Sequence, residues 1–180
     1  MSTEDVCISA QKLVPHCDAA VECMKARLRH PHVQDGAAVW GLARDVGLAD
    51  LDPSYSYLMW CRDFAATSVV ARPTDGGAPL GFVTGYRRPE AADTLFVRQV
   101  AVARAARDQG LELAMLEWLA GNVPDLRYVE TTVTPDDEPA ARLFSAFAAA
   151  NHGQPHRHAL FAPDQFPDSH EPEILFRIRL

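Results

Sequence analysis

One continuous stretch in the second half of the chain constrains the fold more than any other feature. Residues 94–102 are almost wholly apolar apart from Arg98 and Gln99, which is the composition of a buried strand. A short polar turn follows and ends in Gly110. Beyond it, apolar residues recur at the spacing of one helix face, namely Leu111, Ala114, Met115, Trp118 and Leu119. The stretch therefore predicts a strand, a glycine turn and a helix in direct succession.

Apolar periodicity predicts further helices and strands on both sides of this stretch. The expected helices span residues 36–47 and 54–65, and another begins at residues 135–138. The expected strands are 67–71 and 80–86, which a glycine-rich turn joins as a hairpin, then 128–133, 158–161 and 173–178, with a short edge strand at 28–29. This order of elements predicts an α/β fold in which helices cover a mixed sheet.

Length and charge bound the class of protein. A chain of 180 residues suits one globular domain, which we expect over residues 25–180, after an extension at 1–24 that lacks a clear period. The net charge of −7 disfavours nucleic acid and anionic lipid as main partners, because an acidic surface repels both. No apolar run approaches the roughly 20 residues that cross a bilayer, and no signal-peptide pattern opens the chain, so we expect a cytoplasmic protein.

The cysteines and histidines favour a reduced protein without a metal. The sequence has no C-x-x-C pair among its four cysteines, which are Cys7, Cys17, Cys23 and Cys61. Zinc is therefore disfavoured, and a reducing compartment is the simplest interpretation. His156 and His158 alternate as on a strand, but no third ligand accompanies them, so we expect no metal site there.

A strand that leads through a glycine turn into a helix N-terminus is a common way to hold a pyrophosphate group. Exposed backbone N–H groups and the positive end of the helix dipole both point at the anion. Gly110 lacks a Cβ atom, so a phosphate group can approach its backbone closely. The alternative interpretation is a plain strand–helix unit, and the turn by itself leaves both open.

The order of these elements and the spacing within the turn resemble the GNAT superfamily of acetyltransferases. In this chain the turn begins with Arg107, Gly110 follows after two intervening residues, and Glu112 follows after one more. The resemblance implies a six- to seven-stranded mixed sheet flanked by helices, with acetyl-CoA as co-substrate. It also implies that backbone groups of Val100 and Val102 bind the pantetheine arm. Further cofactor contacts implied by the resemblance are Arg107, Gln109, Gly110 and Asp137.

Eight shared runs give a closer resemblance to one GNAT family, the L-2,4-diaminobutyrate acetyltransferases of ectoine biosynthesis. The runs are DGAAVW (35–40), SYSY (54–57), FAATSVVA (64–71), GFVTGY (81–86), DTLFV (93–97), QVAV (99–102), ETTVTP (130–135) and HE (170–171). The resemblance covers nearly the whole chain from about Leu28 onward. It implies acetyl transfer to the γ-amine of diaminobutyrate by direct attack in a ternary complex, and a homodimer.

Acetyl transfer to a diamine requires a proton acceptor for one amine and an anionic group for the other. By resemblance we assign Asp50 and Tyr55 to substrate binding. Glu130 is the first candidate for the base or its relay, and His170 is the second. Each has a plainer interpretation: Glu130 as a solvent-facing strand residue, His170 as a surface residue and Tyr55 as a core aromatic. Asp52, a further carboxylate in the loop, has the plainer interpretation of a helix cap.

Four positions depart from the family pattern. Arg98 stands where the family has Trp near the substrate, so it either weakens ammonium binding or binds the substrate carboxylate. Asp108 and Glu112 place two negative charges beside the pyrophosphate turn, and Asp137 replaces an Asn. These changes leave two alternatives open: an acetyltransferase for another small amine, or a GNAT-fold protein that binds ligands or assembles without catalysis.

Overall fold

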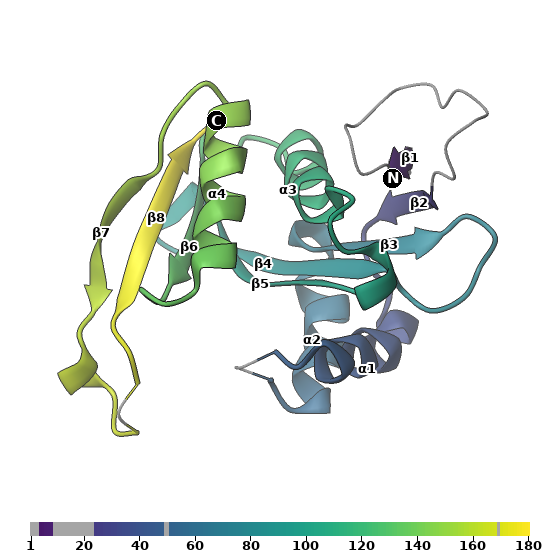
Figure 1. Ribbon diagram of the computed structural model, residues 1–180, viewed down its shortest axis with the longest axis horizontal. Helices are drawn as coiled ribbons and strands as arrows, with labels where there is room; N and C mark the ends of the chain where they lie inside the picture. The colour runs from purple at the N-terminus through teal and green to yellow at the C-terminus, as the bar shows by residue number, and fades with distance from the viewer. Residues whose placement is uncertain (1–3, 9–23, 49–50, 169) are drawn as a thin grey trace. The chain divides into compact units, whose positions relative to one another are not determined.

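The computed structural model describes residues 4–8, 24–48, 51–168 and 170–180, whose helices and strands are labelled in Figure 1. The chain forms two compact units: the first consists of Met1–Tyr86 and Gln99–Val123, the second of Arg87–Arg98 and Pro124–Leu180. Among the described residues, hydrogen bonds connect eight strands in the order β1-β2-β3-β4-β5-β6-β8-β7. Strands β4 (Gly81–Arg88) and β5 (Ala91–Val102) each belong to both units, because the boundaries lie between Tyr86 and Arg87 and between Arg98 and Gln99.

The first unit contains an antiparallel sheet. Its strands are β1 (Glu4–Ile8), β2 (Met24–Arg29), β3 (Val69–Pro73), β4 (Gly81–Arg88) and the last residues of β5. β2 pairs antiparallel with β1 on one side and with β3 on the other, and β3 pairs antiparallel with β4. The expectation of a short edge strand at 28–29 is therefore wrong, because β2 is longer and has a neighbour on each side.

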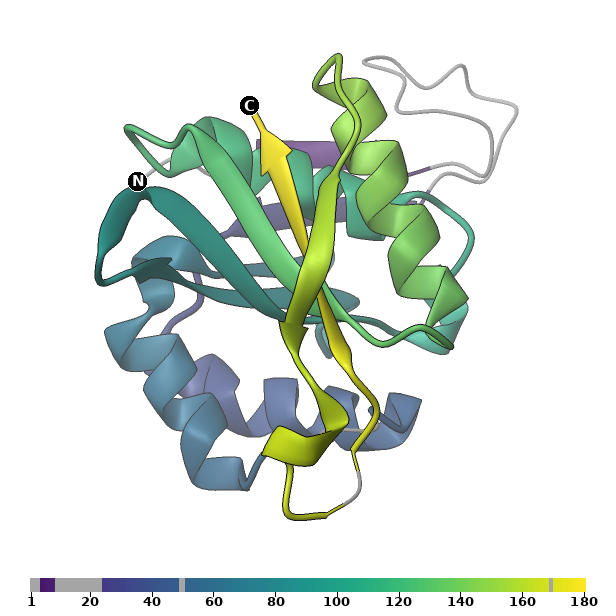
Figure 2. The ribbon, with the colours of Figure 1, turned by 90° about the vertical axis from the view of Figure 1, so that its left-hand side faces the viewer.

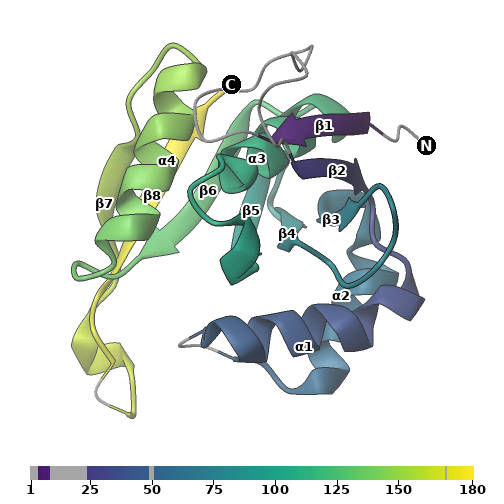
Figure 3. The same cartoon turned by 45° about the vertical axis from the view of Figure 1, so that its right-hand side comes forward.

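Helices cover both faces of this sheet (Figure 3). α1 (Gly36–Val46) and α2 (Ser54–Asp63) lie on one face, and α3 (Leu111–Asn122) lies on the other. Apolar side chains of α1, α2 and the strands form one buried cluster: Val39, Leu42, Ala43, Tyr57, Cys61, Val70, Phe82 and Ala101. The rings of Tyr57 and Phe82 meet edge to face, with centroids 6.0 Å apart. The cluster includes Ala101, so it anchors the end of β5.

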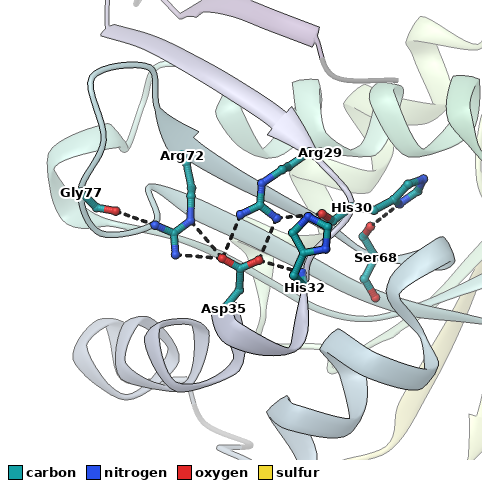
Figure 4. Close-up of polar contacts among 7 residues, drawn as sticks. All are labelled: Arg29, His30, His32, Asp35, Ser68, Arg72 and Gly77. Atoms are coloured by element: carbon teal, nitrogen blue, oxygen red, sulfur yellow. Dashed lines mark hydrogen bonds and ion pairs between the residues drawn. The ribbon is translucent and has the colours of Figure 1, made fainter. Parts of the chain in front are cut away.

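A buried ion-pair cluster fastens the start of α1 to the sheet (Figure 4). Asp35 is 3 % exposed and ends the 3-10 turn η1 (Val33–Asp35) directly before α1. Arg29 on β2 donates two hydrogen bonds to its carboxylate at 2.7 and 3.0 Å, and Arg72 on β3 donates one at 3.1 Å. The backbone N–H of His32 donates another at 2.7 Å. The cluster thus joins one helix to two strands.

The second unit contains a mixed sheet and one helix. Its strands are the first part of β5, then β6 (Tyr128–Val133), β7 (His156–Phe161) and β8 (Glu173–Arg179). β5 pairs parallel with β6, whereas β8 pairs antiparallel with both β6 and β7. α4 (Glu138–Ala150) runs alongside β8 and buries Phe144 and Phe147 (Figure 1).

The expected mixed α/β sheet covered by helices is confirmed, and the described residues form eight strands, one more than the upper number expected. The additional strand is β1, which lies in the stretch expected to be an aperiodic extension. The strand expected at 128–133 coincides with β6. The helix expected at 54–65 ends at Asp63, and a 3-10 turn, η2 (Ala65–Thr67), follows it. None of the described helices is long and apolar enough to span a membrane.

Candidate active site

The end of β5 packs tightly against β4 and α3 within the first unit. Gly81 opens β4, and a Cβ atom there would lie 3.0 Å from the carbonyl oxygen of Ala101 and 3.0 Å from Met115 Cε. Only glycine fits without displacing these neighbours, because the interior is close-packed. Val102 is buried and Val100 is half-buried on the same strand. The backbone expected to meet the pantetheine arm is therefore held firmly in place.

The turn between β5 and α3 is exposed and ends in a left-handed residue. The 3-10 turn η3 (Arg104–Ala106) follows β5, and Gly110 is the N-cap of α3 with φ of 76°. A Cβ atom at Gly110 would have nothing within 4 Å, so the space beside its backbone is open. The first N–H groups of a helix have no partner within the helix and attract anions. The turn therefore has a geometry that fits a phosphate group.

Charged side chains of both signs surround this turn. Arg107 is exposed, and so is Asp108, which has a positive φ of 60°. Glu112 is half-buried in the first turn of α3. Gln109 Nε2 donates a hydrogen bond to the carbonyl oxygen of Ala105 at 3.1 Å, which braces the turn. The two carboxylates oppose the attraction of Arg107 for an anion.

Glu130 lies at the centre of an ion-pair cluster in the second unit. Its side chain is 1 % exposed, so the interpretation as a solvent-facing strand residue is wrong. Arg88 Nη1 lies 3.1 Å from Oε2, and Arg177 Nη1 lies 2.5 Å from Oε1. The guanidinium of Arg177 also stacks on the ring of Tyr128, 3.9 Å from its centroid. Both carboxylate oxygens of Glu130 thus accept hydrogen bonds from guanidinium groups.

His170 is positioned by its neighbours in the loop before β8. Its ring stacks on Phe166 with centroids 4.5 Å apart, and Nδ1 lies 2.6 Å from the carbonyl oxygen of Glu171. A carbonyl oxygen can only accept, so in the neutral ring Nδ1 carries the hydrogen and Nε2 keeps a lone pair. Nε2 lies 3.8 Å from a carboxylate oxygen of Glu173. The pair resembles a base and the anion that stabilises its protonated form.

The register of β6 with β8 separates the two candidate bases. Glu130 is the partner of Arg177, whereas Ile174 is the partner of Val133, three residues further along. The start of β8 therefore lies at least about 10 Å from Glu130 along the strand. His170 precedes β8 by three residues. The structure brings His170 together with Glu173 and does not bring it together with Glu130.

The remaining candidates are distributed over both units. Asp137 is the N-cap of α4, where its Oδ1 accepts a hydrogen bond from the N–H of Ala140 at 3.0 Å. Arg98 is half-buried on β5. Tyr55 on α2 is 66 % exposed, so the interpretation as a core aromatic is wrong for it. Asp50 lies outside the described residues.

The start of α2 also corrects one interpretation. Pro53 occupies the N-cap position of α2 and forms no side-chain cap hydrogen bond. The position expected for Asp52 is therefore taken by the residue that follows it. Among the described residues, no group of three or more His, Cys, Asp or Glu side chains is arranged to hold a metal ion.

Comparison with known proteins places the chain in a family. Residues 39–148 match the family described as Acetyltransferase (GNAT) family. The chain is 49 % identical over 157 residues to the L-2,4-diaminobutyric acid acetyltransferase of Streptomyces coelicolor, covering 84 % of this chain and 91 % of the relative. It is 39 % identical over 153 residues to that of Oceanobacillus iheyensis, covering 83 % and 86 %. The chain belongs to the L-2,4-diaminobutyric acid acetyltransferases of the GNAT family.

Solved GNAT structures agree with this membership. Diaminobutyrate acetyltransferase EctA from Paenibacillus lautus was solved in complex with L-2,4-diaminobutyric acid and coenzyme A. It aligns with this chain at a TM-score of 0.80 and 36 % identity, covering 87 % of this chain and 95 % of that one. Ard1 from Thermoplasma volcanium aligns at a TM-score of 0.69 and 17 % identity, which supports the GNAT fold alone.

Sequence reasoning missed three side chains of this GNAT acetyltransferase. Arg88 and Arg177 bind Glu130, but their proximity depends on strand order and register, which no local pattern reveals. Glu173 was missed although a signal existed. It follows His170 by three residues, close enough for contact across a turn.

Proposed function

We propose that this GNAT acetyltransferase transfers the acetyl group of acetyl-CoA to the γ-amine of L-2,4-diaminobutyrate, the acetylation step of ectoine biosynthesis. The observation that carries the proposal is the likeness to Paenibacillus lautus EctA, which holds both L-2,4-diaminobutyric acid and coenzyme A. The likeness covers 87 % of this chain and so includes residues of both units. The open turn at Gly110 supports it independently.

The first unit supplies the groups for the co-substrate, which brings an activated acetyl thioester. Backbone N–H groups at Gly110 and in the first turn of α3 bind the pyrophosphate, with Arg107 and Gln109 beside them. Val100 and Val102 offer backbone groups to the pantetheine arm. A backbone N–H near Val100 polarises the thioester carbonyl, and a rigid strand does this without reorganising. Asp137 remains a cofactor contact by the family resemblance alone, and its Oδ1 caps α4.

The acceptor amine must lose a proton as it attacks, and we assign His170 to accept it. Nε2 has a lone pair because Nδ1 donates to the carbonyl of Glu171. Glu173 stabilises the imidazolium that forms. Glu130 supports this as a positioning residue, because its two ion pairs hold β6 to β8 and to Arg88. Attack occurs directly in a ternary complex, without an acyl-enzyme.

The other end of the substrate carries an ammonium and a carboxylate. We assign Asp50 and Tyr55 to the ammonium, since an anionic group and an exposed hydroxyl both suit it. Arg98 suits the carboxylate, because a guanidinium binds a carboxylate with two parallel hydrogen bonds. The protein acts as a homodimer in the cytoplasm in this proposal, which the absence of a membrane-spanning helix among the described residues permits.

The direct test is release of free coenzyme A thiol in the presence of L-2,4-diaminobutyrate, with NMR of the product to locate the acetyl group. Lysine, ornithine and putrescine are compared as acceptors. We expect γ-acetylation and a kcat/KM for diaminobutyrate at least tenfold above the others. His170→Asn should lower kcat by roughly 10²-fold or more with an unchanged KM for acetyl-CoA. The matched control is His152→Asn, at an exposed position. Folded protein that turns over none of these amines would contradict the proposal.

One observation favours a second candidate function. Asp108 and Glu112 place two carboxylates around the phosphate turn, which weakens its attraction for an anion. A GNAT-fold protein with weak cofactor binding would act as a ligand-binding or assembly subunit. Intact folding with diaminobutyrate binding, but without coenzyme A binding or turnover, is the result that distinguishes it.

A further inference from the structure

A hollow between α4 and β7 lies in the second unit and contains none of the residues assigned to acetyl transfer. Its volume is about 350 Å³, and it is lined by Glu138, Ala141, Arg142, Ser145 and Arg157. The first four follow one side of α4, and Arg157 belongs to β7, which a short loop joins to α4 (Figure 2). Sites for small molecules have volumes of roughly 300–1,000 Å³. The hollow is therefore large enough for a small molecule.

Arg157 is held in place at one wall of this hollow. Its guanidinium lies 4.4 Å from the ring centroid of Phe176, its partner on β8, which is 3 % exposed. Its Nη2 donates a hydrogen bond of 2.9 Å to Ser145 Oγ. The Ser145 hydroxyl donates its own hydrogen to the carbonyl oxygen of Ala141 at 2.6 Å, which leaves its oxygen to accept from Arg157. The guanidinium is thus fixed between a strand and a helix.

Most of the donors of Arg157 are available to a ligand. A guanidinium has five N–H donors, and Ser145 Oγ is the one acceptor that the described residues offer to them. In the same part of the chain no carboxylate forms an ion pair with Arg157. The contacts with Phe176 and Ser145 already order the side chain, so binding a ligand costs little further side-chain entropy.

The charges that line the hollow favour an anion. Arg142 supplies a second guanidinium, and its Nη1 donates to Glu138 Oε2 at 3.0 Å. Two positive charges and one negative charge leave the lining at +1, whereas the whole chain has a net charge of −7. The side chains of Arg142 and Glu138 are 68 % and 79 % exposed, so their ion pair is weak and Arg142 can turn to a ligand. A guanidinium binds a carboxylate or a phosphate through two parallel hydrogen bonds.

We propose that the hollow between α4 and β7 binds the oxyanion group of a small molecule, a carboxylate or a phosphate, on Arg157 and Arg142. Arg157 supplies the fixed pair of donors, and Arg142 adds a second charge from α4. The rest of the ligand lies against Ala141, while the carboxylate of Glu138 opposes the anion. This site goes beyond the proposed function and does not depend on acetyl transfer.

The test is an NMR titration of ¹⁵N-labelled protein with sodium phosphate, sodium acetate and sodium chloride at constant pH and ionic strength. We expect phosphate or acetate to shift the backbone amide signals of Ala141 and Ser145 with a Kd of about 1 mM or below. Chloride should bind at least roughly tenfold more weakly, because it cannot accept two parallel hydrogen bonds. The phosphate and acetate titrations distinguish the two sources of the oxyanion. The position of the shifted signals separates this hollow from the turn at Gly110, which also attracts anions.

Three substitutions in the hollow should change the affinity in different directions. Arg157→Gln should weaken binding at least roughly tenfold, because it removes the charge-assisted hydrogen bonds. Arg142→Gln should weaken binding roughly threefold, and Glu138→Gln should strengthen it roughly threefold, because the first removes an attracting charge and the second a repelling one. The matched control is Arg44→Gln on α1, which removes a cation that is 55 % exposed beside a carboxylate and should leave the Kd unchanged.

Stronger binding by Glu138→Gln cannot result from a folding defect, so this variant and Arg142→Gln decide the matter if Arg157→Gln does not fold. A Kd above about 10 mM, equal shifts with chloride, or an affinity that these substitutions leave unchanged would overturn the proposal. Acetyl transfer is assayed in parallel. An inactive protein that binds the oxyanion leaves the site standing and contradicts the proposed function, and an active protein whose α4 signals do not respond does the reverse.

Discussion

Asp35→Ala removes the carboxylate that joins α1 to β2 and β3 (Figure 4). The Asp35 side chain is 4 % exposed, and those of Arg29 and Arg72 are 21 % and 29 % exposed. Breaking a buried ion pair costs about 3–5 kcal/mol, because the remaining charge is left uncompensated. Water reaches part of both guanidiniums, so we expect the lower end, about 3 kcal/mol. For a chain of this size the melting temperature should fall by about 6–12 °C.

The pH dependence of this loss has a defined sign. Burial raises the pKa of Asp35, but hydrogen bonds from Arg29 and His32 and the charges of both arginines outweigh it, so its pKa falls below the ordinary 3.8. A lowered pKa in the folded state means that the carboxylate stabilises the fold above pH 3.8. This stabilisation is lost as the pH falls through the folded-state pKa. The difference between wild type and Asp35→Ala is therefore full at pH 7 and shrinks below about pH 4.

The assay is urea denaturation followed by circular dichroism, with thermal melts as a second readout. Asp45→Ala is the matched control on the same helix, because Asp45 is 66 % exposed and pairs with Arg44 at the surface. Its loss should not exceed about 1 kcal/mol. Equal losses for the two variants, or an Asp35→Ala loss that is as large at pH 3 as at pH 7, would refute the reasoning.

Three further predictions concern the cofactor segment and the core. Gly81→Ala should destabilise the fold by about 1–3 kcal/mol in urea denaturation, because its Cβ meets the carbonyl oxygen of Ala101 at 3.0 Å; an unchanged midpoint contradicts this. The double variant Asp108→Gly with Glu112→Ala should bind coenzyme A roughly three- to tenfold more tightly in calorimetry, because it removes two carboxylates that repel the pyrophosphate. An unchanged Kd contradicts this prediction. Burial raises the pKa of Cys61 to about 11, so at pH 8 only about one thiol in a thousand is thiolate. Native wild type and native Cys61→Ala should therefore react with a disulfide reagent to the same extent, and the wild type should react further only in urea. A difference between the two native proteins contradicts this prediction.

Local patterns predicted the parts of the fold that depend on neighbouring residues in the sequence. The apolar spacing before Gly47 placed α1, and the strand expected at 128–133 coincides with β6. The position of Gly110 at the start of α3 followed from the switch from strand to helix periodicity. These features are set by hydrogen bonds and side-chain contacts within a few residues, so a single sequence contains them.

The same local patterns do not predict pairing between segments that are far apart in the sequence. The burial of Glu130 depends on Arg177, 47 residues away, lying on the next strand. β1 was missed because its pairing with β2 crosses a long connection, and its own residues show no clear period. Asp137 looked like a cofactor contact by resemblance, whereas the structure also gives it the role of capping α4. For Glu130 and for β1 the deciding neighbour is remote in sequence, whereas the partner of Asp137, the N–H of Ala140, lies three residues away.

Thermal stabilisation by coenzyme A tests the central claim that the turn at Gly110 holds a pyrophosphate. Ligand at 100 times its Kd stabilises the folded state by about 2.7 kcal/mol, which corresponds to roughly 5–10 °C here. Gly110→Ala should lose most of this shift, because a methyl group enters the open space beside the turn backbone. Gly121→Ala, at another open position in α3, should keep it. No shift in the wild type, or an undiminished shift in Gly110→Ala, would contradict the account.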